Sequence, residues 1–352
     1  MSTLNTINLE FIEAASIIDA SGVATMVADW MAAEGTELAD DTLRDLSHVL
    51  SGWLATGLAG FPLTDENVSQ ALQENGMARA TPALVHGFTS LLLDLMDYSP
   101  LPTGAPLTKA AYEAALKARA ESSEKLKAKR LRHLAFTNSI LRAQLDSTAC
   151  VDGTLSIALG SLFRTAGVAG VSLRAYEQMP AAEHVSAEPD AGFRLNDPDT
   201  GELDYGWGYE VATLQSTDLL RSDSVPNIII GVAGHKPRDY GAAAGELVQD
   251  ILGSGRTIER VSGDLAYFPT LHPELVQAPL REHGAQLVMR YTPQDEGRVL
   301  AASGDSILVE GRWYRSDLPR RCSRPWPTSE PLSSATGSLM VGASSTHVSN
   351  PH

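Results

Sequence analysis

Between residues 227 and 291, short apolar runs alternate with segments of helical pattern, which limits the chain to a few folds. Asn227–Val232 contains three consecutive isoleucines, typical of a strand buried on both faces. Thr257–Gly263 and Ala285–Tyr291 are two further strands. The helices between the strands are Tyr240–Leu252 and His272–His283, each followed by a glycine. This alternation predicts a mixed sheet with helices between its strands.

Two more strands precede this region, and a hairpin follows it. The first strand, Ala149–Leu159, includes Val-Asp-Gly-Thr at residues 151–154. The second, Tyr209–Leu214, comes after a polar stretch that extends to about Leu203. Gly304–Tyr314 has the pattern of a hairpin. The order from Val151 is therefore strand, strand, strand, helix, strand, helix, strand, which is the order of a ribonuclease-H-like fold.

Residues 1–105 have a helical pattern. Apolar side chains from Leu43 to Leu54 fall on one helical face. Thr81 and Pro82 form a helix start, with a capping hydroxyl followed by proline at the first helical position. Tyr98–Pro106 contains three prolines and reads as a linker. We therefore expect an α+β or α/β protein: a helical N-terminal domain, followed by an incomplete ribonuclease-H-like mixed-sheet domain at residues 147–319.

Basic residues are concentrated between these two domains. Thr108 opens a long helical stretch, and residues 106–146 are predicted to be basic connecting helices. Lys125, Lys129 and Arg132 share one helical face. This face is either an ordinary solvated surface or a surface that contacts DNA phosphates. The net charge of −16 opposes nucleic-acid binding, but most of the acidic excess lies outside this stretch.

Two aspartates occupy places where this fold carries catalytic acids. Asp152 is on the first strand, and Asp264 follows the fourth. The first and fourth strands of such a sheet are neighbours, so two carboxylates could bridge divalent metals roughly 4 Å apart. Oxygen ligands alone suit Mg²⁺ or Mn²⁺. Alternatively, Asp152-Gly153-Thr154 is a turn and both aspartates are structural.

Residues 107–319 resemble DDE-type insertion-sequence transposases, particularly transposase-like proteins of actinobacteria. The resemblance implies DNA strand cleavage and transfer by three acids and two metals, with Asp152 and Asp264 as the first two catalytic metal ligands. It also implies transposon ends as the partner and a homo-oligomer. The resembling motifs, in chain order, are Arg132–Leu141, Val151–Thr154, Pro189–Phe193, Trp207–Glu210, Gly263–Tyr267, Pro279–Tyr291 and Gly311–Tyr314.

The third acid of this family is a glutamate on a helix after the last strand, and no such segment follows here. The remaining candidates lack that context; they are Glu296, Glu310 and Glu330. Residues 320–352 are rich in Ser, Thr and Pro, with no periodicity, and we expect them to be disordered. We therefore predict weak or no strand transfer by this chain.

Other positions have competing interpretations. Lys236 and Arg238 follow an apolar strand and lie in an ordinary strand-to-helix loop or face DNA. Glu210 is interpreted as a surface strand residue, with an auxiliary metal ligand as the alternative. For the whole chain, one rival is a non-catalytic DNA-binding or oligomerising regulator of a full-length transposase. A second rival is an unrelated acidic α/β protein.

The sequence also indicates where the protein works. It has no membrane-length apolar run and no signal peptide pattern at its start. Its two cysteines are far apart and fit a reducing compartment. We expect a cytoplasmic protein with no membrane partner and no small-molecule substrate.

Overall fold

The computed structural model describes residues 3–99, 106–147, 154–166, 173–185, 190–197, 201–216, 228–237, 239–263, 267–268, 272–289, 299–309 and 312–315. The chain divides into two compact units, Met1–Arg290 and Tyr291–His352. The boundary falls inside the segment predicted as one domain. Several predictions lie outside the described residues: those for Asp152, Arg238, Asp264, Glu296, Glu310, Glu330 and the tail at 320–352.

Five helices form the first part of the larger unit: α1 (Thr3–Ser21), α2 (Val23–Ala33), α3 (Asp40–Leu58), α4 (Asp65–Glu74) and α5 (Pro82–Met96). They enclose their own apolar core, which includes Val27, Leu46 and Leu72, all fully buried. The helix start predicted at Thr81 and Pro82 is confirmed, because the Thr81 hydroxyl accepts a hydrogen bond from the Leu84 amide.

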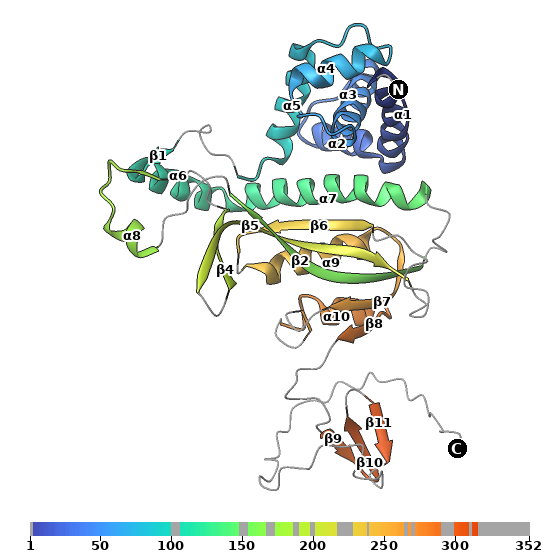
Figure 1. The fold of residues 1–352 in the computed structure, drawn as a ribbon, viewed down its shortest axis with the longest axis vertical. Helices are drawn as coiled ribbons and strands as arrows, with labels where there is room; N and C mark the ends of the chain where they lie inside the picture. Colours follow the sequence, from blue (N-terminus) through green and yellow to red (C-terminus); the bar gives the residue numbers. More distant parts are fainter. Residues whose placement is uncertain are drawn as a thin grey trace. The chain divides into compact units, whose positions relative to one another are not determined.

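The basic stretch forms two helices, α6 (Lys109–Glu121) and α7 (Ser123–Ser147). The Thr108 hydroxyl caps α6 by accepting from the Ala111 amide. Helix α7 contacts α1, α2 and α5 on one side and strand β6 on the other (Figure 1). Its apolar residues divide accordingly: Phe136 and Ile140 pack on the helical core, whereas Leu134 and Leu145 belong to the core of the sheet.

The sheet is mixed, and its strands are β2 (Thr154–Thr165), β4 (Gly192–Asp197), β5 (Glu202–Gln215), β6 (Ile229–His235), β7 (Thr257–Gly263) and β8 (Gln286–Met289). The hydrogen-bonded order is β4-β5-β2-β7-β8. Strand β6 also pairs with β5, along a later part of β5 than the part that pairs with β4. Pairing is antiparallel between β2 and β5 and between β5 and β6. It is parallel from β2 to β7 and from β7 to β8.

Two helices accompany the sheet. Helix α9 (Tyr240–Gly253) packs on β5 and β6 through a buried face that includes Leu247 and Ile251. The other, α10 (Gln277–Glu282), is shorter than predicted, because residues 273–276 are turns. Pro279 supplies the reason: it has no amide hydrogen and is accommodated only in the first turn, so the helix begins just before it.

Three short elements were not predicted: β1 (Leu107–Thr108), α8 (Leu173–Gln178) and β3 (His184–Val185), with β1 and β3 pairing antiparallel. Strand β4 was also missed, because its alternating apolar residues, Phe193 and Leu195, stand in a stretch that is otherwise polar.

In the smaller unit, β9 (Val299–Ser303), β10 (Ser306–Val309) and β11 (Arg312–Arg315) form an antiparallel sheet in the order β11-β10-β9. The predicted hairpin corresponds to β10 and β11, and β9 extends it.

No single helix in the described part of the chain has both the length and the apolar character to cross a membrane. One bent pair, Glu10–Ser21 with Val23–Ala33, passes that test on length and composition alone.

Candidate functional site

The two strands predicted to carry the acids, β2 and β7, are neighbours and run parallel. Asp152 precedes the first residue of β2 by two positions, and Asp264 directly follows the last residue of β7. Both aspartates lie outside the described residues, and the ladder between β2 and β7 places the residues next to them.

The register of this ladder places the first residue of β2, which follows Asp152 by two positions, far from the residue that precedes Asp264 on β7. Thr154 pairs with Thr257 at the start of both strands, whereas Ala158 pairs with Ser262 near the end of β7. Gly263, the last residue of β7, is therefore about 20 Å along the strand from the level of Thr154, at roughly 3.3 Å per residue. A shared two-metal site needs both carboxylates at one end of the strand pair.

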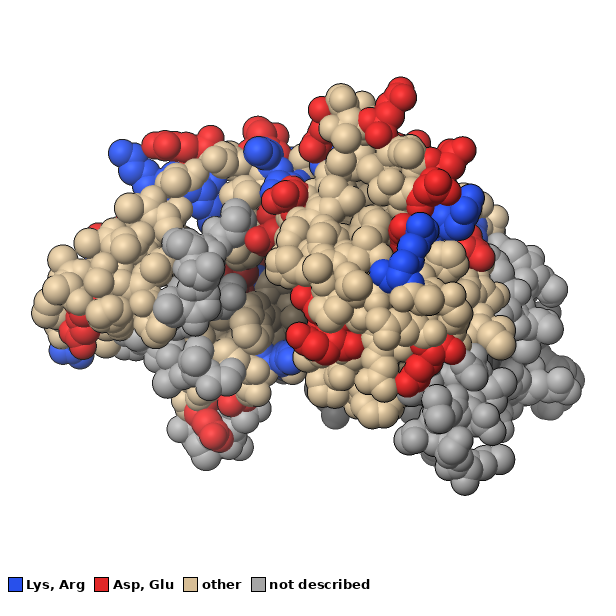
Figure 2. All heavy atoms as spheres, turned by 90° about the horizontal axis from the view of Figure 1, so that it is seen from above, with Lys and Arg blue, Asp and Glu red and all other residues tan. Residues whose placement is uncertain are grey.

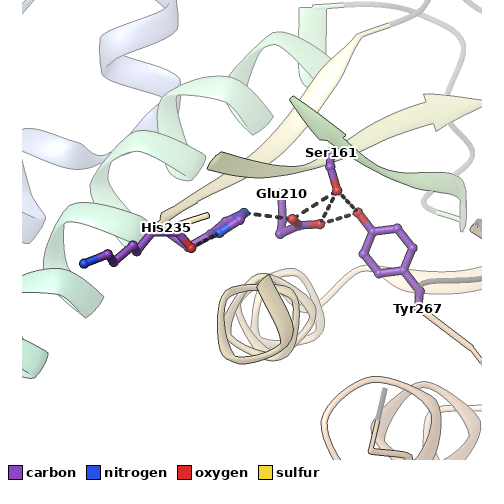
Figure 3. Close-up of polar contacts among 5 residues, drawn as sticks. Ser161, Glu210, His235 and Tyr267 are labelled. Atoms are coloured by element: carbon purple, nitrogen blue, oxygen red, sulfur yellow. Dashed lines mark hydrogen bonds and ion pairs between the residues drawn. The ribbon is translucent and has the colours of Figure 1, made fainter. Parts of the chain in front are cut away.

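A buried carboxylate lies at the end of β7 where Asp264 follows. Glu210 of β5 pairs with Ser161 of β2, just beyond the last described residue pair of β2 with β7. Glu210 is 1% exposed. The interpretation of Glu210 as a surface residue is therefore wrong: its side chain points into the molecule, among partners from three other segments (Figure 3).

His235, the last residue of β6, is the first partner. Its Nε2 lies 2.9 Å from Glu210 Oε1, and its Nδ1 lies 2.8 Å from the carbonyl oxygen of Lys236. Each ring nitrogen thus faces an oxygen, and the imidazole is held between the Glu210 carboxylate and the backbone at the end of β6.

Gly208 makes this contact possible. A Cβ atom at Gly208 would lie 2.3 Å from His235 Cε1, so any larger residue would push the imidazole away from Glu210. The Trp-Gly-Tyr-Glu motif at residues 207–210 thus combines the carboxylate with the glycine that admits its partner.

Ser161 and Tyr267 complete the cluster. The Ser161 hydroxyl lies 3.1 Å from both Glu210 oxygens and 2.9 Å from the Tyr267 hydroxyl. Tyr267, itself 1% exposed, donates to Glu210 Oε2. Tyr267 ends the Gly-Asp-Leu-Ala-Tyr motif that begins at Gly263, so this motif is anchored on Glu210.

The hydrogen bonds of this cluster indicate a structural role, in which Glu210 joins several segments of the chain. With three donors around it, the Glu210 carboxylate could bind a metal only by releasing some of them. Across the described ranges, no group of three or more His, Cys, Asp or Glu side chains is placed to hold a metal ion.

Of the predicted DNA-contacting residues that the structure describes, Arg132 does not lie free on the surface with the lysines. Lys125 is exposed and Lys129 partly so, but Arg132 turns toward the helical part. Its guanidinium lies 2.5 Å from a Glu34 carboxylate oxygen and 5.7 Å from the centre of the Trp30 ring. Lys236 is exposed beside the cluster. On the face shown in Figure 2, basic side chains occur in small groups among scattered acidic ones.

Two neighbouring hollows lie near the cluster, and His235 lines the smaller one. The larger hollow has a volume of about 460 Å³ and is lined by α6, α7, Glu246 of α9 and Tyr98. The smaller hollow next to it shares Tyr98 and Arg130 and extends to Trp207, Tyr209 and Lys236. Burial and the nearby Asp190 carboxylate raise the pKa of Tyr98 above its ordinary value. Sequence reasoning missed these hollows, because their lining comes from segments distant in the chain.

Comparisons with known proteins give no indication of function. No family model, no curated protein and no solved structure matches the chain. The functional argument therefore rests on the strand arrangement, the buried cluster and the hollows.

Proposed function

We propose that this chain is a transposase-like protein, of the type that cleaves and transfers DNA strands by two-metal phosphodiester chemistry, with weak or no strand-transfer activity of its own. The observation that carries the proposal is the pairing of β2 and β7 as adjacent parallel strands. Asp152 and Asp264 are its proposed catalytic acids, Mg²⁺ or Mn²⁺ its cofactor and transposon ends its partner. We propose a cytoplasmic homo-oligomer.

The order of elements supports this assignment. Strands β2, β5 and β6 are followed by α9, β7, α10 and β8, which is the ribonuclease-H-like order. The first and fourth of these strands are neighbours, as such a fold requires. The two resembling motifs at the end of β7 and in β5 also meet, through Tyr267 and Glu210.

The register of β2 against β7 argues that activity is low. In the described register, the flanks of Asp152 and Asp264 lie at opposite ends of β7. A centre with one acid at each end would bind paired metals poorly, because neither metal would have its full set of oxygen ligands.

A non-catalytic regulator of a full-length transposase is the second candidate, and the helical part favours it. Leu58, Phe61 and Leu63, at the connection between α3 and α4, are 50%, 44% and 65% exposed. Apolar side chains grouped in this way suit contact with another protein chain. Such a regulator would pair with the active enzyme or occupy its DNA ends.

A strand-transfer assay with labelled duplex DNA and Mn²⁺ tests the proposal. The full chain should bind duplex DNA and yield little or no transfer product. Any product should disappear in Asp264→Asn and persist in Glu259→Gln, a matched change at an exposed residue of the same strand. Efficient transfer that is insensitive to Asp264→Asn would refute the assigned acids. Failure to bind DNA or metal would instead favour an unrelated acidic α/β protein.

The aspartates can also be tested separately by metal-dependent stabilisation. If they share one metal site, Asp152→Asn and Asp264→Asn should both remove the rise in Tm caused by Mn²⁺. If the described register holds in the metal-bound protein, Asp264→Asn alone should remove it.

A further inference from the structure

We infer that the larger hollow, between α6 and α7, binds a small monoanion that carries an apolar group, such as an aliphatic or aromatic carboxylate. The inference goes beyond the proposed function, because this ligand is not a substrate of strand transfer. The lining of the hollow includes neither Asp152 nor Asp264, so the two proposals rest on different residues and each can fail alone.

Helix α6 is packed on only part of its surface. None of its residues is buried, although the helix is 13 residues long and rich in alanine. The edge-on contact of Tyr112 with the Tyr176 ring, with centroids 6.2 Å apart, holds the first half of the helix. In the second half, Leu116 is 36% exposed and Ala120 is exposed too, and both line the hollow. The packing of α6 therefore leaves an apolar wall uncovered.

The hollow has the size and the organised lining of a ligand site. Its volume of about 460 Å³ falls within the roughly 300–1,000 Å³ typical of sites for small organic ligands. On each helix, lining residues recur three or four positions apart, so they share one face. These residues are Leu116, Arg119 and Ala120 on α6, and Leu126, Lys127 and Arg130 on α7.

The charge of the hollow indicates a ligand with one negative charge. Three cations and one carboxylate line it, in a chain of net charge −16. Two of the cations are already balanced, because Arg119 lies 2.6 Å from Asp190 and Arg130 lies 2.8 Å from Glu246. Lys127 is exposed and has no ion pair within the described part of the chain. One positive charge therefore remains for a ligand.

The donors and the apolar wall favour a carboxylate with an apolar group. Arg130 contacts Glu246 through Nε, and its two terminal nitrogens are not part of that contact. Guanidinium groups hold carboxylates through such N–H donors, and Lys127 adds its charge. Leu116 and Leu126 can cover the apolar end of the ligand. A second negative charge, as on a phosphate, would lie unbalanced close to Glu246.

A bound ligand would contact several elements at once. Tyr98, which follows α5, and Glu246 of α9 line the same hollow as α6 and α7. Amide hydrogens exchange readily in a helix without buried residues, because little packing opposes its local opening. Occupation of the hollow should therefore hold α6 against α7 and slow the exchange of its amides.

Isothermal titration calorimetry of the full chain tests the inference with three probes, octanoate, 1-octanol and acetate. Octanoate combines the charge with an apolar chain, whereas each of the others has only one of these features. Octanoate should bind at one site and at least roughly tenfold more tightly than either of the others, because it gains both contributions. Hydrogen exchange should slow in α6 when octanoate is added, and should stay unchanged in α4, which does not line the hollow.

Two matched pairs of variants separate charge from apolar contact. Lys127→Glu should weaken octanoate binding at least roughly tenfold. Lys125→Glu, an equally exposed change on the same helix outside the hollow, should leave it unchanged. Leu116→Ser should weaken octanoate binding roughly tenfold, whereas Leu131→Ser, at a residue of α7 that is 43% exposed and outside the hollow, should not. All these side chains are exposed, so the variants should fold.

Several outcomes would overturn the inference. Equal effects of Lys125→Glu and Lys127→Glu would show that octanoate responds to the overall charge and not to the hollow. Equal binding of octanoate and 1-octanol would remove the role of Lys127. Absence of saturable octanoate binding, or unchanged exchange in α6, would exclude the site. None of these results involves the Mn²⁺ shift that depends on Asp264, so a failure here is distinct from a failure of the proposed function.

Discussion

At the scale of single residues, Glu210 is the group with the greatest consequence for the fold. Its carboxylate is almost completely buried and joins β5 to β2, β6 and Tyr267. A buried charge is tolerated when its partners are in place, and it becomes costly when one is removed. We therefore assign Glu210 and His235 to positioning the end of β7.

Removing the partner of Glu210 should destabilise the protein strongly. His235→Ala leaves the Glu210 carboxylate buried without its imidazole partner, and we expect the free energy of unfolding to fall by about 3 kcal/mol. Urea denaturation measures this. His272→Ala, at a side chain that is 81% exposed, is the control and should change the free energy by less than about 0.5 kcal/mol. Equal effects in the two variants would show that the buried pair does not hold this part of the sheet.

His133 should make stability depend on pH. Partial shielding from solvent, and secondarily the Arg130 guanidinium, lower its pKa below the ordinary value of 6.5. The folded state therefore resists protonation. The stability that this contributes is present above pH 6.5 and is lost as pH falls through the lower pKa of the folded state. Because the residue is substantially exposed, we expect a loss of less than about 1 kcal/mol.

Unfolding measured at pH 7.5 and at progressively lower pH, in wild type and in His133→Gln, isolates this effect. The variant should lose less stability than wild type over the acid range. A steeper loss in the variant would reverse the assigned sign.

At the scale of elements, α7 connects the helical part to the sheet. Asn138 shows how: it is fully buried, its Oδ1 accepts from the Val232 amide of β6 at 2.7 Å, and its Nδ2 donates to Asp250 of α9 at 2.9 Å. Arg142 also donates to Asp250, at 2.6 Å. The Asn138 side chain thus pairs with a backbone amide of the edge strand β6 and links α7 and α9 to that strand.

Asn138→Ala should therefore cost more than an ordinary surface change. The Val232 amide and the Asp250 carboxylate would each lose a buried partner, and we expect about 2 kcal/mol of destabilisation. Thermal or urea unfolding measures it, with Lys125→Ala at an exposed position of the same helix as the control. A loss no larger than that of the control would mean that water replaces the amide without cost.

Local sequence patterns predicted most helices and strands, whereas the contacts between these elements could not be predicted from the sequence. Thr257–Gly263 was expected as a strand with the bounds it has, because its apolar pattern and flanking glycines are local. Strand β4 has only the short alternation of Phe193 and Leu195 in a polar stretch, and it pairs with the edge of β5. The contact of Glu210 with His235 depends on the register of β5 and β6, and a single sequence does not specify that register. A weak signal did exist, in the glycine two residues before Glu210.

At the scale of the whole molecule, the strand arrangement and the charge distribution point in different directions. The order and pairing of the sheet fit the proposed transposase-like core, whereas the net charge of −16 opposes tight binding of DNA. Binding is therefore expected to depend on local basic positions. It should weaken as salt rises, with a slope set by the few phosphates contacted. A slope near zero in an anisotropy titration would exclude electrostatic contact with DNA.

The measurement that tests the central claim most directly is the Tm of the full chain with and without Mn²⁺, in wild type, Asp264→Asn and Glu259→Gln. If Asp264 is a metal ligand at the end of β7, Mn²⁺ should raise the Tm of wild type and Glu259→Gln, and Asp264→Asn should remove the rise. Absence of any rise in wild type, or a rise that survives Asp264→Asn, would contradict the transposase-like metal site.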